Sequence, residues 1–217
     1  MALIVGTESR AEIRDMSIMS SQLQHRYTLE EYFALELASE EKYEFWNGDV
    51  WCMSGASLAH NQISRNLGTA IDTQIRELGC QIFLSDMRVK VPAYPPYRYP
   101  DLTALCGGPE VEQVNGLDLL VNPTLIIEIL SPSTEAFDRG DKFTFYKSIP
   151  SFSEYVLVAQ HRPHVTQLVR GEKGLWTHAE FNSLTDVVQC ASAPCRLALQ
   201  EIYRDVDFDP AGQPGSR

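Results

Sequence analysis

The residue that most needs a chemical explanation is Glu128, a carboxylate in the most apolar segment of the chain. Residues 125–130 read Leu-Ile-Ile-Glu-Ile-Leu, which is typical of a strand buried on both faces. An ionised carboxylate is costly in such a place unless a cation accompanies it. Glu128 is therefore either half of a buried ion pair with Arg or Lys, or a metal-binding residue.

A second carboxylate, Asp101, follows Pro100 at the start of another predicted strand. One strand, a loop and a returning strand fit between Asp101 and Glu128, so the two side chains can lie on neighbouring strands and share a hard cation. Mg²⁺ prefers carboxylate oxygens and retained water, and phosphate esters are its usual substrates in proteins. The pair predicts phosphate-ester chemistry with Mg²⁺ or Mn²⁺.

The composition limits the classes of function. The chain has 217 residues with 18 Lys+Arg and 29 Asp+Glu, a net charge of −11, which argues against a protein that coats nucleic acid nonspecifically. Of four consecutive parts of the chain, only residues 61–100 are net positive, so any contact with nucleic acid must be local. No stretch approaches the ~20 apolar residues of a membrane-spanning helix and no signal peptide is evident. We expect a soluble, cytoplasmic protein.

The cysteines are five in number and contain no CxxC pair. A chain of this length does not depend on cross-links, so the sequence predicts reduced, mostly buried thiols rather than disulfides. Structural zinc is disfavoured because His161 and His164 have no cysteine pair near them in the sequence, so the fold would have to assemble any set of ligands.

The chain divides into a flexible N-terminal extension (1–26), a single domain (27–208) and a disordered tail (209–217). Thr28 and Glu31 form a capping-box pattern that predicts a helix to residue 36 or 37. Asn47-Gly48 predicts a hairpin of residues 42–46 and 49–53. Helical spacing of apolar residues predicts the longest helix over 63–78, ending at Gly79.

The remaining elements complete a mixed α/β (α+β) domain. Strands are predicted at 81–84, 87–91, 101–106, 125–130, 155–159, 165–170, 175–178 and 187–189. A Pro/Tyr loop is predicted at 92–100 and a polar helix at 138–148.

Several motifs then carry a family resemblance, in this order along the chain: residues 43–54 with Glu44, His60, Asp86 to Val89, Pro100-Asp101, 123–134 with Glu128, Asp138 to Lys142 with Tyr146, and 154–158. With them, residues from about 27 to 203 resemble the bacterial Uma-type family of restriction endonucleases, assigned to the PD-(D/E)xK nuclease superfamily. The resemblance implies a restriction-endonuclease-like core, with a mixed β-sheet flanked by helices and an N-terminal helix and hairpin.

Carried over by position, the resemblance makes Asp101 and Glu128 the metal-binding pair, with Glu44 as a further acidic residue of the site. The superfamily's lysine would stand at position 130, which is Leu130 here. Lys142 is the expected replacement, unless it is an ordinary exposed lysine. The implied reaction is hydrolysis of phosphodiester bonds by a Mg²⁺-activated water, with Lys142 stabilising charge on the phosphate.

Four other motif residues are candidates for substrate binding: His60, Asp86, Arg88 and Ser131. Each also has a structural interpretation. His60 suits a structural histidine, Asp86 and Arg88 can form a surface ion pair, and Ser131 fits a Ser-Pro turn that ends the strand. Lys90 is a weaker substitute for the missing lysine.

The substrate implied by the resemblance is nucleic acid, in the first place DNA, and a homodimer would suit cleavage of both strands. An alternative is a catalytically degenerate module of the same fold that binds nucleic acid or protein. A third interpretation is a structural protein whose carboxylates pair with Arg65 or Arg88.

Overall fold

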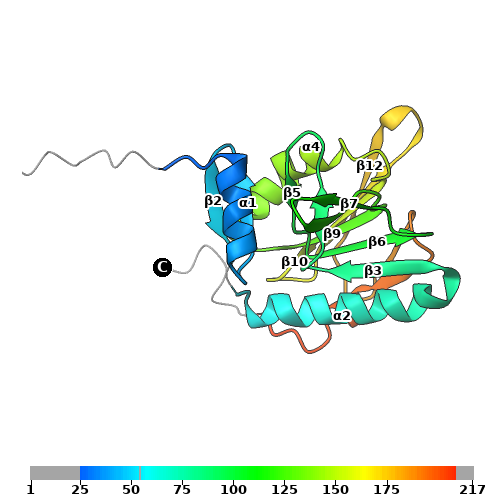
Figure 1. Cartoon of the computed structure of the whole chain (residues 1–217). Coiled ribbons are helices and arrows are strands. Elements are labelled where there is room, and N and C mark those ends of the chain that lie inside the picture. The colour runs from blue at the N-terminus through cyan, green and yellow to red at the C-terminus, as the bar shows by residue number, and fades with distance from the viewer. Residues whose placement is uncertain (1–24, 54, 209–217) are drawn as a thin grey trace, which may run out of the picture.

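A computed structural model describes residues 25–53 and 55–208 (Figure 1). The predicted tail 209–217 and all but the last two residues of the predicted extension 1–26 lie outside these ranges. Within them, no helix is both long and apolar enough to cross a membrane.

A six-stranded mixed sheet forms the centre of the fold. Its strand order is β12 (Trp176–Phe181), β11 (Val165–Arg170), β10 (Glu154–Ala159), β9 (Leu125–Leu130), β6 (Leu102–Cys106) and β3 (Cys80–Leu84). β9 and β10 are parallel and the other neighbours are antiparallel. Every residue of β9 and β10 is buried, as the apolar run 125–130 predicts. The short 3-10 turn η3 (Glu172–Gly174) joins β11 to β12.

Helix α2 (Leu58–Ile75) covers one face of this sheet (Figure 1). Its apolar stripe is fully buried against alternate residues of β9 and β10. The helix begins before the predicted position because Ser57 caps it, accepting a hydrogen bond from the His60 N–H. After the 3-10 turn η1 (Arg76–Leu78), Gly79 takes a left-handed conformation with φ 71°, which glycine adopts without steric cost. Three further elements contribute to the same core: β13 (Val187–Gln189), β14 (Arg196–Ala198) and α5 (Leu199–Ile202).

The opposite face is covered by the segment that follows β9. It consists of α3 (Glu135–Phe137), the π-helical turn η2 (Asp138–Lys142) and α4 (Phe143–Tyr146). The prediction of one regular helix over 138–148 is therefore wrong in detail, because the helix contains a widened turn and ends at Tyr146. Buried aromatic side chains of this segment pack against the sheet.

A second, four-stranded sheet has the order β5 (Tyr97–Arg98), β4 (Arg88–Lys90), β8 (Leu117–Leu120) and β7 (Val111–Val114). Helix α1 (Leu29–Ala38) and the hairpin β1 (Tyr43–Trp46) with β2 (Asp49–Cys52) share an apolar cluster with it. The capping box of Thr28 and Glu31 is present, and Asn47 and Gly48 have φ 44° and 89°, as the hairpin prediction requires.

Three strands of this second sheet, β5, β7 and β8, were absent from the sequence prediction. β5 lies within the predicted loop 92–100, and the β7–β8 hairpin turns at Asn115-Gly116, with φ 52° and 83°. The Asn-Gly signal for this turn is the same as at residues 47–48.

The prediction of reduced thiols is wrong for one pair of cysteines. Cys80 and Cys106 form a disulfide, because antiparallel pairing of β3 with β6 places them directly opposite each other. The other three, Cys52, Cys190 and Cys195, are free thiols.

Candidate functional site

Antiparallel pairing of β6 with β9 brings Asp101 next to Glu128. Leu102 is opposite Ile127, so Asp101, one position earlier, comes level with Glu128. The Asp101 N–H donates to Glu128 Oε2 at 3.4 Å, and the Ile129 N–H donates to Asp101 Oδ2 at 2.7 Å. The structure thus places the two carboxylates on neighbouring strands, as their spacing predicted.

Glu128 lies on the sheet face that α4 covers, with Ile126 and Leu130 on the same face. Its side chain is 3% exposed, and Tyr146 donates a hydroxyl hydrogen bond of 2.9 Å to Oε1. Burial raises the pKa of Glu128 to about 8. The positive charge of Lys142 lowers this pKa in part, and the negative charge of Asp101 raises it further. Even with Lys142 beside it, this carboxyl group therefore keeps its proton at neutral pH when no metal ion is bound.

Lys142 is the cation in contact with Glu128. Its Nζ lies 2.9 Å from Glu128 Oε1 and 3.1 Å from Asp138 Oδ1. Burial alone would lower the pKa of Lys142, but the charges of Glu128, Asp138 and Glu44 raise it well above the ordinary value. The ammonium group therefore stays charged. Lys142 is thus no exposed helix lysine, whereas Leu130 packs in the apolar core and supplies no charge.

Two residues of this centre, Asp138 and Tyr146, were not among the predicted site residues. Asp138 is 2% exposed, and its main-chain carbonyl accepts a hydrogen bond from Tyr155 at 3.1 Å. The turn η2 places Asp138 and Lys142 four residues apart with both side chains buried, and such π-helical turns are frequent at functional sites. The i,i+4 spacing of Asp138 and Lys142 was a signal that could have identified the pair.

His60 reaches Asp101 from the first turn of α2. Its Nε2 lies 3.2 Å from Asp101 Oδ1, and the two side chains are 17% and 18% exposed. Burial would raise the pKa of Asp101, but its contact with His60, the Ile129 N–H and the Lys142 charge together hold this pKa below the ordinary value. Asp101 is therefore an ionised carboxylate at the more accessible edge of the site.

Glu44 faces the same site from the hairpin strand β1. Its Oε1 accepts a hydrogen bond of 3.3 Å from the Tyr99 N–H. Its charge helps to raise the pKa of both Lys142 and Tyr146, so Glu44 adds to the negative potential around Glu128.

The other predicted residues lie elsewhere. Asp86 is in the turn before β4 and pairs with Lys42 at 2.7 Å. Arg88 lies 3.3 Å from Glu36, in a cluster that includes the buried hydroxyls of Tyr97 and Tyr99. The predicted surface pair between Asp86 and Arg88 is therefore absent from the described residues.

Neither Ser131, Lys90 nor Arg65 joins the carboxylates. The Ser131 hydroxyl lies 2.9 Å from Thr134 Oγ1 and accepts from the Thr134 N–H, which makes it part of the turn that follows β9. Lys90 pairs with Glu112. Arg65 pairs with Asp205 at 3.7 Å, so the interpretation that Arg65 or Arg88 neutralises the two carboxylates is wrong.

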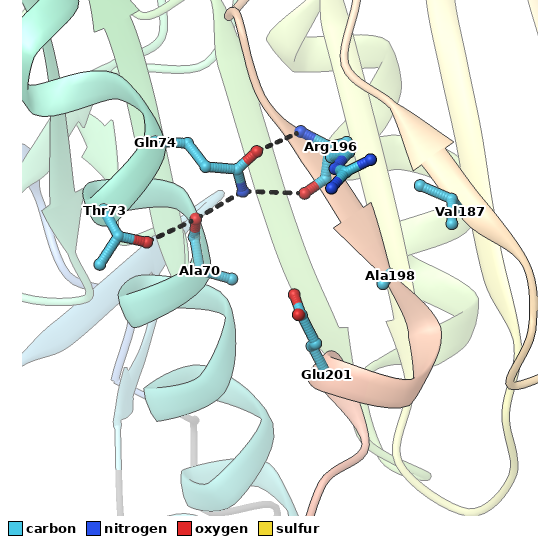
Figure 2. A pocket seen from close by; sticks show the side chains of 7 residues that line it. All are labelled: Ala70, Thr73, Gln74, Val187, Arg196, Ala198 and Glu201. Atoms are coloured by element: carbon cyan, nitrogen blue, oxygen red, sulfur yellow. Dashed lines mark hydrogen bonds between the residues drawn. The ribbon is translucent and has the colours of Figure 1, made fainter.

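A separate pocket lies between α2 and β14 (Figure 2), lined by Ala70, Thr73, Gln74, Val187, Arg196, Ala198 and Glu201. It contains none of the residues predicted for the site. Gln74 bridges the two elements by hydrogen bonds of 2.9 and 3.0 Å with the main chain of Arg196.

The donor chemistry of the site fits a hard divalent cation. Carboxylate oxygens are the ligands that Mg²⁺ prefers. Glu128 and Asp138 contact the Lys142 ammonium group, and Glu44 and Asp101 interact with it through their charges. In the described ranges, no three His, Cys, Asp or Glu side chains gather closely enough to hold a metal ion by themselves. An ion held by Asp101 and Glu128 would therefore keep water or substrate oxygens in its shell, which is the usual habit of Mg²⁺.

Residues 29–200 match the model of the Uma2 family, whose description is "Putative restriction endonuclease". The chain belongs to the Uma2 family. Two uncharacterised proteins of Synechocystis sp. (strain ATCC 27184 / PCC 6803 / Kazusa) are similar to it. One is 30% identical over 82% of this chain and 92% of its own length; the other is 37% identical over 61% of this chain and 75% of its own length.

A solved structure shows the fold of this Uma2 member. The crystal structure of "a putative nuclease belonging to DUF820 from Anabaena variabilis ATCC 29413" superposes with a TM-score of 0.64 and 17% sequence identity, covering 82% of this chain and 98% of the other. The predicted restriction-endonuclease-like α+β fold is confirmed.

Proposed function

We propose that this protein is a nuclease that hydrolyses phosphodiester bonds of nucleic acid with the help of Mg²⁺ or Mn²⁺. The observation that carries the proposal is the adjacency of Asp101 and Glu128 on paired strands, with the Lys142 ammonium 2.9 Å from Glu128. Membership in the Uma2 family and the restriction-endonuclease-like fold support it.

Each side chain has a role in this reaction. Asp101 and Glu128 would hold the cation, which supplies an activated water and polarises the phosphate when bound. Lys142, a buried donor whose pKa is raised by the neighbouring carboxylates in spite of its burial, stabilises negative charge that develops on the phosphate. Glu44 adds to the negative potential that favours the cation. His60, in contact with Asp101 at the exposed edge, is placed to carry a proton to or from the reacting groups.

DNA is the substrate we propose in the first place, because the family description names a restriction endonuclease. Cutting both strands of a duplex requires two sites, so a homodimer belongs to the same proposal. Light scattering with and without duplex DNA tests this part independently of cleavage.

The central experiment is a cleavage assay on plasmid DNA, single-stranded DNA and RNA with Mg²⁺, Mn²⁺ or EDTA. Asp101→Asn and Lys142→Gln should each lower the rate by about a hundredfold or more, the scale of a lost charge-stabilising group. Asp72→Asn is the matched control, since this carboxylate pairs with Arg76 and lies twelve residues after His60 on α2, about 18 Å along the helix axis. Cleavage that persists in EDTA, or that Asp101→Asn leaves unchanged, would contradict the proposal.

The burial of Glu128 favours one alternative, a degenerate module that binds without hydrolysis. The carboxylate is 3% exposed and already neutralised by Lys142. This alternative predicts no cleavage under any condition, and no Mn²⁺ binding detectable by paramagnetic resonance, in a folded wild-type protein that still binds nucleic acid.

A further inference from the structure

Three exposed arginines lie on segments that hydrogen bonds connect to the end of α2 where His60 contacts Asp101. Arg65 lies on α2, Arg162 in the turn between β10 and β11, and Arg204 directly after α5, and all three are exposed. We call this set, Arg65, Arg162 and Arg204, the arginine face.

The turn that carries Arg162 is fixed to the end of α2 that bears His60. The hydroxyl of Ser57, the helix cap, donates to Gln160 Oε1 at 2.6 Å. Gln160 Nε2 donates in turn to the Leu130 carbonyl at 2.8 Å, at the end of the strand that carries Glu128. The arginine turn, the helix end and the carboxylate strand are therefore in direct contact.

Tyr203 joins the segment of Arg204 to the same turn. Its hydroxyl lies 3.0 Å from the Ala159 carbonyl and 2.9 Å from the His164 carbonyl, the two ends of the β10–β11 turn. Burial raises the pKa of Tyr203, and the nearby charge of Arg162 opposes this rise. Arg162 is thus close to the buried hydroxyl that anchors the segment before Arg204.

Asn66 completes the connection to α2. Its Nδ2 donates to the carbonyls of Ile202 and Arg204 at 2.9 and 2.8 Å. Arg65, the neighbour of Asn66, lies five residues after His60, about 8 Å along the helix axis at the usual rise. The segments that carry the arginine face are therefore joined to the end of α2 that bears His60, whose side chain contacts Asp101.

The charges of this face are available to a ligand. In the described part of the chain, neither Arg162 nor Arg204 forms an ion pair. Arg65 pairs with Asp205 at 3.7 Å, with side chains 60% and 70% exposed, and such exposed pairs contribute little. Asp205 and Asp207 are the acidic neighbours in sequence, so phosphate groups would compete with Asp205 for Arg65.

We propose that the arginine face binds the phosphate backbone of the nucleic acid and directs it towards Asp101. The inference rests on the proposed function. In a chain of net charge −11, nonspecific attraction to phosphate is weak, so binding depends on a local cluster of arginines.

The test is fluorescence anisotropy in EDTA with a labelled duplex DNA of about 30 base pairs, and with its single strand, at several salt concentrations. Arg162→Gln and Arg204→Gln should each raise Kd about three- to tenfold. On the duplex, the slope of log Kd against log salt concentration should fall by about the amount that corresponds to one phosphate contact. Circular dichroism verifies that these surface variants fold.

Arg196→Gln is the matched control. Arg196 is an exposed arginine of β14 (Figure 2). It lies beside Gln74, which belongs to the last turn of α2, far along the helix from His60. Its replacement by Gln changes the net charge by the same amount as the other two substitutions. Gln74 contacts only its main chain among the hydrogen bonds drawn there. Kd should stay within about twofold of the wild type for this variant.

Three results would overturn the proposal that the arginine face binds DNA. Arg196→Gln could raise Kd as much as the other two substitutions do, or a double Arg162→Gln, Arg204→Gln variant could keep the Kd of the wild type. The third is that the wild type binds neither the duplex nor the single strand. A parallel cleavage assay with Mn²⁺ separates the two proposals. If the double variant loses binding but the wild type never cleaves, the nuclease proposal fails alone. If the wild type cleaves and the double variant keeps its Kd and KM, the arginine face fails alone.

Discussion

The Lys142 ammonium group lies 2.9 Å from Glu128 Oε1, although the two residues come from different elements, the turn η2 and the strand β9. A lysine on the strand itself would have to replace Leu130, whose side chain fills the apolar core beside Tyr146 and Tyr155. The π-helical turn η2 packs on one face of the sheet and thus supplies, through Lys142, the positive charge that strand β9 does not carry.

Removal of this charge should destabilise the protein strongly. In Lys142→Met, the carboxylates of Glu128 and Asp138 lose their common cation, and breaking a buried pair in this way costs about 3–5 kcal/mol. Lys147→Met is the control, since Lys147 is exposed over the ring of Phe143 and should cost less than about 1 kcal/mol. Urea unfolding of both variants measures the difference, and equal losses would contradict the assigned ion pair.

The hydroxyl of Tyr146 should stabilise the same carboxylate. Tyr146 is fully buried and donates to Glu128 Oε1 at 2.9 Å. At about pH 9, where Glu128 is ionised, Tyr146→Phe should lower the free energy of unfolding by about 1.5–3 kcal/mol, the range for a hydrogen bond to a charged group. In a Glu128→Gln background the same substitution should cost clearly less, because the charged acceptor has gone. A double-mutant cycle measured by urea unfolding reports this coupling. If the loss of unfolding free energy in the double variant equals the sum of the two single losses, the hydroxyl acts independently of Glu128.

Local patterns predicted the parts of the fold that local physics determines. The strand 125–130, the capping box at Thr28 and the Asn47-Gly48 turn each depend on residues within a few positions of one another. These three features need no knowledge of how distant elements pack. The closeness of Asp101 and Glu128 was predicted from their spacing, although the connection between β6 and β9 contains the β7–β8 hairpin of the second sheet.

Features that depend on the register of distant elements could not be predicted in this way. Cys80 pairs with Cys106 because β3 and β6 are aligned with these residues opposite each other. Arg88 shares a motif with the site residues, yet it belongs to the second sheet and pairs with Glu36 of α1. The π-helical turn at Asp138 also has no signature in hydrophobic periodicity, because the two residues that it buries, Asp138 and Lys142, are charged.

The disulfide should contribute measurable stability only under oxidising conditions. It joins Cys80 and Cys106, which are separated by 26 residues, and closure of a loop of this size restricts the unfolded chain enough to stabilise by about 2–4 kcal/mol. Cys106→Ser should lose this amount without reductant, and the wild type and variant should converge when a reductant is present. Cys52→Ser, which removes an exposed free thiol, is the control. Identical stability of Cys106→Ser and wild type without reductant would show that the cross-link does not form.

The raised pKa of Glu128 should make the stability of the metal-free protein fall as pH rises towards 8. Burial raises this pKa from an ordinary value of 4.5 to about 8. Between these two values the folded protein holds one proton more than the unfolded chain, so each increase in pH favours unfolding, and the contribution of this group ends above about pH 8. Glu128→Gln, which is neutral at every pH, lacks this contribution.

The measurement is urea unfolding of wild type and Glu128→Gln in EDTA from about pH 5 to about pH 9. Other titrating groups largely cancel in the difference between the two proteins. The wild type should lose stability relative to the variant from pH 5 to 8, and the difference should then level off. Glu201→Gln, at an exposed position of α5, should show a nearly constant difference. A wild type that gains stability relative to Glu128→Gln over this window would mean that Lys142 holds Glu128 ionised in spite of its burial.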